Sequence, residues 1–178
     1  MRRIVTGHSV EGQSIFVSDG EPPRAIQLNN LPGLEHVEIW ATPNIPSNPA
    51  DENDPTPTLL SLVPAPGETR FRIVRFPSTL EVTRAVEAGM DQEALAKEYL
   101  QKAPGLAEAH ESNGSGMHRT NTVDYGIVLS GQIWLELDNG VKKKLQPGDF
   151  VIQNGTRHAW RNEFEEPCLM AFIMIGAK

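Results

Sequence analysis

The stretch GQIWLELDNGVKKKL, residues 131–145, has both the alternation and the turn chemistry of a β-hairpin. Aliphatic side chains occupy every second position from Ile133 to Leu137, which is the period of a strand with one buried face. The tripeptide Asp-Asn-Gly follows at residues 138–140, and these residue types tolerate the positive φ of a tight turn. The stretch therefore predicts two antiparallel strands joined by a short turn.

Short β-type segments separated by glycine and proline recur on both sides of this hairpin. Before it, we predict strands at RRIVTGH (2–8), SIFVSDG (14–20), RAIQL (24–28), HVEIWAT (36–42), TLLSLV (58–63) and TRFRIVRF (69–76), and another that begins at Val123. After it, we predict strands at FVIQ (150–153), HAWRN (158–162) and LMAFIMIG (169–176). Many short strands at close spacing are typical of an antiparallel sandwich or barrel, so the predicted fold class is all-β.

Two segments depart from this β pattern. MDQEALAKEYLQKA, residues 90–103, consists largely of strong helix formers and offers Asp91 as an N-cap, so it predicts one short amphipathic helix that ends at Pro104. PNIPSNPADENDPTPT, residues 43–58, is rich in proline, asparagine and acidic residues and predicts an exposed loop or a mobile flap.

The composition is that of one domain with a hydrophobic core, since the chain has 178 residues of which 39% are hydrophobic. We expect N-terminal strands and the proline-rich loop over residues 1–56, and a barrel that includes the helix over residues 57–178. Lys and Arg total 16 against 23 Asp and Glu, a net charge of -7, which argues against a nucleic-acid partner.

The sequence also argues against a membrane partner. No stretch approaches the roughly 20 apolar residues of a membrane span, and the basic start MRRIVTGHSV lacks the apolar core of a signal peptide. The single cysteine, Cys168, cannot form an internal disulfide and precedes an apolar run, where a buried thiol is expected. We therefore expect a cytoplasmic location.

A candidate site involves two histidines and an aspartate. Asp124 lies six positions after His118, which is about 20 Å on an extended strand, so either the two are unrelated or the chain bends between them. Residues 119–122, Arg-Thr-Asn-Thr, suit such a bend. Far along the chain, His158 shares a strand face with Trp160 and would face the interior with it. Two imidazoles and a carboxylate that converge inside a barrel form a facial triad, the ligand set of non-haem iron sites.

Residues 117–162 resemble the two motifs of the cupin superfamily, G(x)5HxH(x)3-4E(x)6G and G(x)5PxG(x)2H(x)3N. In the first motif, His118 matches the first histidine, Asp124 stands at the glutamate position and Gly131 is the final glycine. The second motif is matched by Gly148, Gly155, His158 and Asn162. On this resemblance the chain is identified as a small single-barrel cupin, similar to type 2. The fold it implies is a double-stranded β-helix, or jelly roll, with an N-terminal β extension and one short helix.

The chain departs from both motifs. Thr120 stands in place of the second histidine, Gln153 in place of the proline, and Ser112 in place of the leading glycine. The second motif is also one residue shorter before Gln153. Three of the four positions that hold metal in cupins with the full pattern are therefore kept, with aspartate in place of glutamate.

The resemblance implies a divalent transition metal held by His118, Asp124 and His158. Candidates for a fourth ligand are His110, Glu111 and Gln153. Iron, manganese, nickel and zinc all suit histidine with carboxylate, so the sequence does not choose among them.

The leading functional hypothesis is a metal-dependent enzyme acting on a small carboxylated or aromatic metabolite, of the lyase/decarboxylase or dioxygenase type. The expected substrate-binding residues are Thr120, Tyr125, Gln153 and Trp160. The alternative is a non-enzymatic cupin, a binding or regulatory module without metal, in which His118 and Asp124 form a hydrogen-bonded pair. Fold alone does not decide between them.

The N-terminal strands predict an assembly. Strands from Arg2 to about Thr42 exceed what one small barrel needs, and unpaired strand edges tend to find partners. We therefore predict a homodimer in which the N-terminal strands extend a sheet of the partner.

Overall fold

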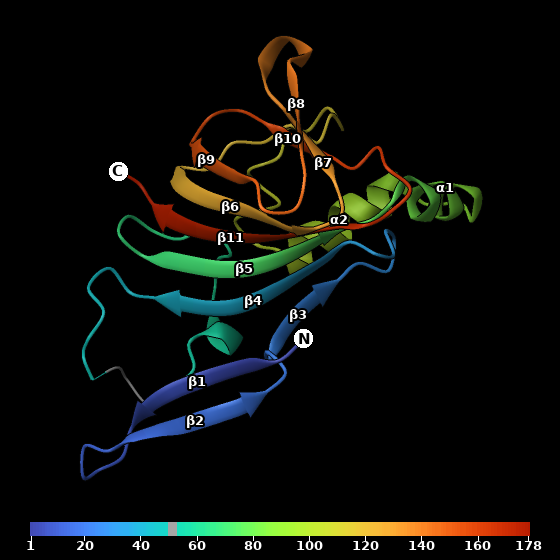
Figure 1. Cartoon of the computed structure of the whole chain (residues 1–178). Coiled ribbons are helices and arrows are strands. Elements are labelled where there is room, and N and C mark those ends of the chain that lie inside the picture. Colours follow the sequence, from blue (N-terminus) through green and yellow to red (C-terminus); the bar gives the residue numbers. More distant parts are fainter. Residues whose placement is uncertain (50–52) are drawn as a thin grey trace.

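The computed structural model of the chain describes residues 1–49 and 53–178. Its strands, labelled in Figure 1, are β1 (Arg3–His8), β2 (Ser14–Gly20), β3 (Arg24–Gln27), β4 (Glu35–Thr42), β5 (Thr69–Phe76), β6 (Thr122–Ser130), β7 (Ile133–Glu136), β8 (Lys142–Leu145), β9 (Phe150–Asn154), β10 (Ala159–Arg161) and β11 (Cys168–Gly176). Its helices are α1 (Thr79–Glu87) and α2 (Gln92–Lys102), with 3₁₀ turns at Thr56–Thr58 and Asp138–Gly140.

In the described part of the chain, the strands form three antiparallel sheets (Figure 1). The largest has the order β3-β4-β5-β11-β6-β9, a smaller one has the order β10-β7-β8, and β1 pairs with β2 in a separate hairpin. Antiparallel pairing throughout confirms the all-β prediction. The two larger sheets are the two halves of a double-stranded β-helix.

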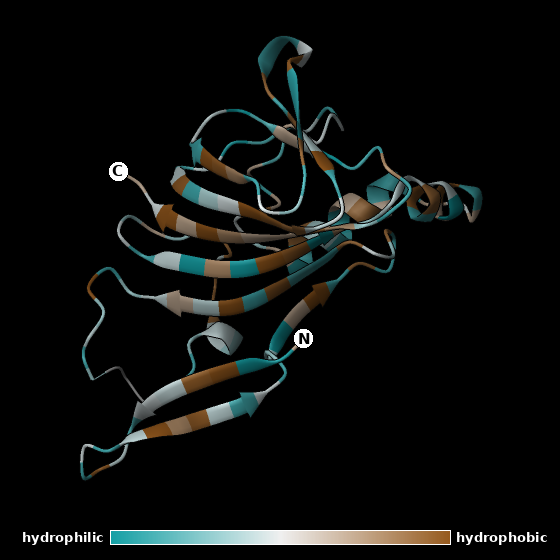
Figure 2. Cartoon of the chain, viewed as in Figure 1, coloured by the Kyte–Doolittle hydropathy of each residue, from teal (hydrophilic) through white to brown (hydrophobic). Residues whose placement is uncertain are grey.

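The main hydrophobic core lies between the two larger sheets. Its buried members are Val74, Val128, Ile133, Cys168, Met170, Phe172 and Met174. Most of them come from β11, which lies inside the six-stranded sheet and is apolar at almost every position (Figure 2). A strand that is covered on both faces needs such a continuous apolar run.

The predicted hairpin forms as β7 and β8. Its turn contains Asn139 and Gly140 with φ angles of 59° and 71°, the left-handed region that these residue types tolerate. Ile133 at its start is fully buried, which fixes the face that β7 turns to the core.

The predicted helix near residues 90–103 forms as α2. Asp91 caps its N-terminus, because the carboxylate accepts hydrogen bonds from two backbone N–H groups of the first turn. Leu95 and Tyr99 pack on a second core cluster, formed by Ile26, Leu28, Leu62, Ala103 and Leu106. No helix in the described residues is both long enough and apolar enough to cross a membrane.

Two predictions of secondary structure were wrong. The segment TLLSLV is not a strand: the N–H of Leu62 donates to the carbonyl of Pro104 at 2.8 Å, and the carbonyl of Leu62 accepts from the Arg72 guanidinium. Its backbone groups are therefore satisfied outside any sheet. The helix α1 was not predicted at all, although Ser78 and Glu81 form a capping box at its start, a pattern that the sequence carries.

The proline-rich loop runs over the surface. Residues 43–49 are exposed, as predicted, and Asp54 accepts hydrogen bonds from the backbone and the hydroxyl of Thr56 at 2.9 and 2.7 Å. Asp54 also pairs with Arg3, so this end of the loop is tied to β1. The part of the predicted flap at residues 50–52 lies outside the described residues.

The β1–β2 hairpin forms a sheet separate from the two larger ones (Figure 1). Every residue of β2 is exposed, including Ile15, Phe16 and Val17. Exposed apolar residues on the edge strand of a two-stranded hairpin favour association with another chain. The homodimer therefore stays a prediction, with this hairpin as the contact surface.

We predict that the chain is a dimer by light scattering at micromolar concentration and that Phe16→Glu makes it a monomer, because a charge would have to be buried at the interface. Leu60→Glu is the matched control, since Leu60 is 92% exposed and Phe16 76% exposed, but only Phe16 lies on the hairpin. A monomeric wild-type protein, or a dimer that survives Phe16→Glu, would refute this assembly.

Candidate functional site

A cavity of about 560 Å³ lies against the inner face of the six-stranded sheet, next to α2 and the segment that follows it. Much of its wall is apolar, with Phe76, Leu95, Leu106, Trp160, Phe172 and Met174 among the side chains that line it. Its polar side chains include a cluster of histidines and a group on β4, β5 and β6. A largely apolar cavity with a few polar groups is the usual form of a small-molecule site.

Backbone pairing brings three histidines together from distant parts of the sequence. His118 forms β-bridges with His110 and with His158. His118 and His158 exchange backbone hydrogen bonds of 2.9 and 3.0 Å. Ring centroids lie 4.3 Å apart for His110 and His118, and 4.2 Å apart for His118 and His158. The two predicted histidines are therefore neighbours, and His110 completes a histidine cluster with them.

Hydrogen bonds fix the tautomer of each histidine in the cluster. The Nδ1 atoms of His110, His118 and His158 lie 2.9, 3.2 and 2.9 Å from the carbonyl oxygens of Leu106, Gly116 and Thr156. Because a carbonyl oxygen can only accept, Nδ1 carries the hydrogen in each neutral ring and Nε2 keeps a lone pair. The cluster therefore offers three unprotonated Nε2 atoms.

Burial keeps these rings neutral. It lowers the pKa of His118 to about 3, and the nearby His158 and His110 add to the effect. Burial also lowers the pKa values of His110 and His158, although their hydrogen bonds to backbone carbonyls act in the opposite direction. At neutral pH the cluster is therefore a set of uncharged hydrogen-bond acceptors.

Other rings extend the cluster at both ends. Tyr99 of α2 meets His110 edge-on at 5.5 Å and lies 5.9 Å from His36 of β4. Trp160 of β10 meets His158 edge-on at 5.7 Å. All of these rings line the cavity, and we call them the ring row: His36, Tyr99, His110, His118, His158 and Trp160.

An ion pair ties the segment that carries His110 to the turn before His158. Glu111 accepts two hydrogen bonds from Arg157, with Nε to Oε1 at 2.5 Å and Nη2 to Oε2 at 2.8 Å. Arg157 also donates to Asp138 at 2.8 Å. Because a bidentate pair fixes orientation as well as distance, it helps to hold His110 and His158 in register with each other.

A second ion pair is buried at the sheet side of the cavity. Arg72 of β5 and Glu38 of β4 are partners in the sheet register, and their side chains are 2% and 0% exposed. Arg72 Nε lies 3.0 Å from Glu38 Oε1, and Arg72 also donates to the carbonyl of Leu62. Burial raises the pKa of Glu38, while the positive charge of Arg72 acts against that shift.

Asp124 and His36 line the cavity beside Arg72, and we call these three residues the polar floor. In the described part of the chain, Oδ1 of Asp124 and Nδ1 of His36 are buried and have no hydrogen-bond partner. Burial raises the pKa of Asp124, whereas a hydrogen bond from Thr122 and the charge of Arg72 lower it. Burial, with smaller contributions from Arg72 and His110, lowers the pKa of His36 to about 3.

Residues 106–175 match a family model described as a Cupin domain. The chain therefore contains a cupin domain over these residues. The matched range of this cupin contains the histidine cluster, Asp124 and Trp160, whereas His36 and Arg72 come before it.

Several proteins resemble this cupin over nearly its whole length. The "Phomopsin biosynthesis cluster protein C'" of Diaporthe leptostromiformis is 29% identical over 178 residues, which cover 99% of this chain and 78% of that protein. A cupin-domain-containing oxidoreductase of Neurospora crassa, srdB, is 27% identical over 178 residues, 99% of this chain and 74% of the relative. A solved structure, a putative ethanolamine utilization protein Q from Salmonella typhimurium, aligns with a TM-score of 0.43 at 6% identity, covering 100% of this chain and 98% of that one.

The predicted substrate-binding residues of this cupin fall into two groups. Thr120 and Trp160 line the cavity. Tyr125 is exposed on the outer face of β6, because side chains alternate along a strand and Asp124 takes the inner face. Gln153 is buried, but its amide donates to the carbonyl and hydroxyl of Thr156 at 3.1 and 2.6 Å. Tyr125 and Gln153 therefore do not line this cavity, and a role for them in substrate binding stays a prediction.

The predicted metal ligands His118, Asp124 and His158 all line the cavity of this cupin. As their side chains lie, they do not fit a metal ion: in residues 1–49 and 53–178, no group of three or more His, Cys, Asp or Glu could hold one. Of the candidates for a fourth ligand, His110 belongs to the histidine cluster, whereas the carboxylate of Glu111 forms an ion pair with Arg157. Metal binding therefore stays a prediction.

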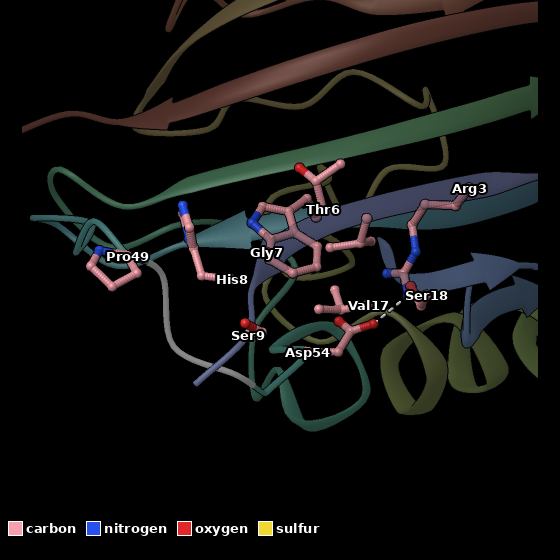
Figure 3. A pocket seen from close by; sticks show the side chains of 11 residues that line it. Arg3, Thr6, Gly7, His8, Ser9, Val17, Ser18, Pro49 and Asp54 are labelled. Carbon is pink, nitrogen blue, oxygen red and sulfur yellow. Dashed lines mark hydrogen bonds and ion pairs between the residues drawn. The ribbon is translucent and has the colours of Figure 1, made fainter. Parts of the chain in front are cut away.

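A smaller cavity of about 310 Å³ lies between the N-terminal hairpin and β4 (Figure 3). Arg3 pairs there with Asp54, donates to the carbonyl of Ile39 at 3.2 Å and lies 5.7 Å from the centre of the Trp40 ring. The charges of Arg3 and Asp54 in this cavity neutralise each other. The contacts of Arg3 serve to hold the hairpin against the sheet.

Sequence reasoning missed three residues of the site in this cupin: His36, Arg72 and Tyr99. The sequence carries a weak signal for two of them. His36 and Glu38 share a strand face in HVEIWAT, and Arg72 in the nearby TRFRIVRF has the opposite charge to Glu38. Tyr99 shares a helix face with Leu95, which predicted burial but no contact with histidine.

We predict that Arg72→Met lowers the free energy of unfolding by about 3–5 kcal/mol, because it leaves the Glu38 carboxylate buried without a partner. The double variant Glu38→Met/Arg72→Met should recover most of this loss, since neither charge then remains. Urea denaturation of the three proteins measures both effects. Equal stability of the two variants would mean that the unpaired carboxylate is not the cause.

We predict that stability falls with acid partly through His36. Its folded pKa is about 3 against 6.5 when unfolded, so the unfolded chain binds the extra proton between these values. The contribution of His36 to the free energy of unfolding is complete above pH 6.5 and is lost as the pH falls toward 3. Below pH 6.5 the free energy of unfolding should fall more steeply in the wild type than in His36→Gln, by up to about 1.4 kcal/mol per pH unit. Parallel pH profiles in urea denaturation would exclude this role.

Proposed function

We propose that this cupin is an enzyme that binds a small, neutral, aromatic or apolar metabolite in the cavity and moves a proton between that metabolite and the histidine cluster. The observation that carries the proposal is the set of three neutral imidazoles, each with a free Nε2 lone pair, on the wall of a largely apolar cavity. The similarity to a cupin-domain-containing oxidoreductase supports an enzymatic role.

His118 is the proposed proton acceptor because it lies between the other two histidines. Burial disfavours an isolated imidazolium at this position. A proton taken from a ligand O–H, or from a C–H next to a carbonyl group, however, leaves a negative oxygen on the ligand beside the new imidazolium, and the two charges stabilise each other. Return of the proton to another atom of the ligand completes an isomerisation or assists an elimination, with no oxidant consumed.

The charges around the cavity favour a neutral substrate. Among the described residues, the arginines that line the cavity are Arg72 and Arg161, and each already has a carboxylate partner. Arg72 pairs with Glu38 at 3.0 Å and Arg161 with Glu136 at 2.7 Å. A carboxylate ligand would therefore find no spare positive charge, so an aromatic metabolite is better supported than a carboxylated one.

The apolar wall suits a flat ligand. Trp160 lies 5.4 Å from Phe172 and 6.3 Å from Phe76 between ring centroids, in tilted or edge-on arrangements. An aromatic ligand can continue this packing, which adds to the area it buries.

We predict that the protein accelerates hydrogen–deuterium exchange at the methyl group of acetophenone, a neutral aryl ketone, and that His118→Ala lowers the rate by about 100-fold. Proton NMR in deuterated buffer measures the exchange against the uncatalysed rate. His8→Ala is the control, since His8 is an exposed histidine of the hairpin.

Three outcomes separate the alternatives. Exchange that needs His118 and survives treatment with EDTA supports proton transfer by the histidine cluster. Exchange that EDTA abolishes, with stoichiometric metal in the wild type and none in His118→Ala, would instead support the metal site predicted from the sequence. Binding of acetophenone without exchange would favour a non-enzymatic binding module.

A further inference from the structure

We infer that the polar floor, formed by Arg72, Asp124 and His36, is a subsite that binds a hydroxyl group of the ligand. The inference rests on the proposed function, because it concerns the molecule that occupies the same cavity. It specifies the substrate class as a hydroxylated apolar or aromatic compound, whose hydroxyl group lies at the sheet while the rest of the molecule extends toward the histidine cluster.

The three side chains face one cavity from three strands of the same sheet. His36, Arg72 and Asp124 lie on β4, β5 and β6, and all three line the cavity. In the sheet register, Arg72 pairs with Phe172 of β11, and Asp124 pairs with Met174 of the same strand. Arg72 and Asp124 therefore lie on opposite sides of β11, offset by two residues along it. Two strand spacings separate them by about 10 Å across the sheet, which a ring-sized ligand can span.

The side chains are buried, yet in the described part of the chain three of their polar atoms make no hydrogen bond, and of these only Arg72 Nε has an ion-pair partner, Glu38 Oε1 at 3.0 Å. Arg72, His36 and Asp124 are 2%, 5% and 6% exposed. Within residues 1–49 and 53–178, neither Oδ1 of Asp124 nor Nδ1 of His36 has a hydrogen-bond partner. Buried polar atoms are normally satisfied, and an unsatisfied pair on one cavity wall indicates a ligand group that satisfies them. A carboxylate oxygen needs a donor, which a hydroxyl group supplies.

The fixed charges select a hydroxyl group over a carboxylate. Arg72 is held by Glu38 and by the carbonyl of Leu62, so its charge is compensated within the protein. Asp124 would repel an anion placed beside it. A hydroxyl group can donate to Asp124 without bringing a charge into the cavity.

The test compares three probes of nearly equal size by isothermal titration calorimetry on the full chain. These are 4-ethylphenol, ethylbenzene and 4-ethylbenzoate, which carry a hydroxyl group, no polar group and a carboxylate. We expect 4-ethylphenol to bind at least about tenfold more tightly than ethylbenzene, because only the phenol satisfies the buried groups. 4-Ethylbenzoate should bind more weakly than the phenol.

Two variants assign the preference to the polar floor. Asp124→Leu keeps the side-chain shape and removes the acceptor, so it should reduce the preference for the phenol over ethylbenzene to about threefold or less while ethylbenzene still binds. His36→Leu provides a second variant should the first fail to fold, with a smaller loss expected. Asp149→Leu is the control, since this aspartate lies on an exposed turn and should keep the wild-type preference.

The outcomes distinguish this inference from the proposed function. Equal binding of 4-ethylphenol and ethylbenzene, or tightest binding of 4-ethylbenzoate, would overturn the hydroxyl subsite while leaving an apolar ligand cavity in place. An unchanged preference in both Asp124→Leu and His36→Leu would do the same. Failure of all three probes to bind would overturn the proposed function and this inference together.

Discussion

The buried ion pair between Arg72 and Glu38 is the constraint on which the cavity depends. Taking both charges out of water is costly, and only their close pairing across β4 and β5 makes it tolerable. The pair also binds the carbonyl of Leu62, which lets the segment before β5 pass over the sheet without forming a strand. The inner face thus stays polar at one place within an otherwise apolar core, and there the unsatisfied atoms of Asp124 and His36 gather.

Much of the fold could be predicted from the sequence, because its strands are short and bounded by clear turns. The β7–β8 hairpin combined alternation with an Asp-Asn-Gly turn, and α2 combined helix formers with an N-cap. His118 and His158 could be brought together because each stands in one of two motifs whose strands are neighbours in the resembled fold. His110 had no such position, and it joins them through a backbone bridge that only the folded loop forms.

The polar floor could not be predicted, because alternation along β5 is ambiguous. In TRFRIVRF both faces carry apolar residues, and the usual rule would bury Phe71 and Ile73 and expose Arg72. The structure buries Arg72 fully, since its partner in the register is Glu38. Tyr125 lies outside the cavity for a related reason: a one-residue step along a strand changes the face, and the motif does not say which face meets the ligand.

The pair of Glu111 with Arg157 has a consequence for the conditions in which the ring row keeps its shape. No member of the histidine cluster carries a charge at neutral pH, yet two of them are held in register by an ion pair whose side chains are partly open to solvent. Dissolved ions screen such a pair far more than a buried one. Ionic strength should therefore loosen the arrangement of the uncharged imidazoles, and the protein's behaviour toward its ligand should vary with added salt even when the ligand is neutral.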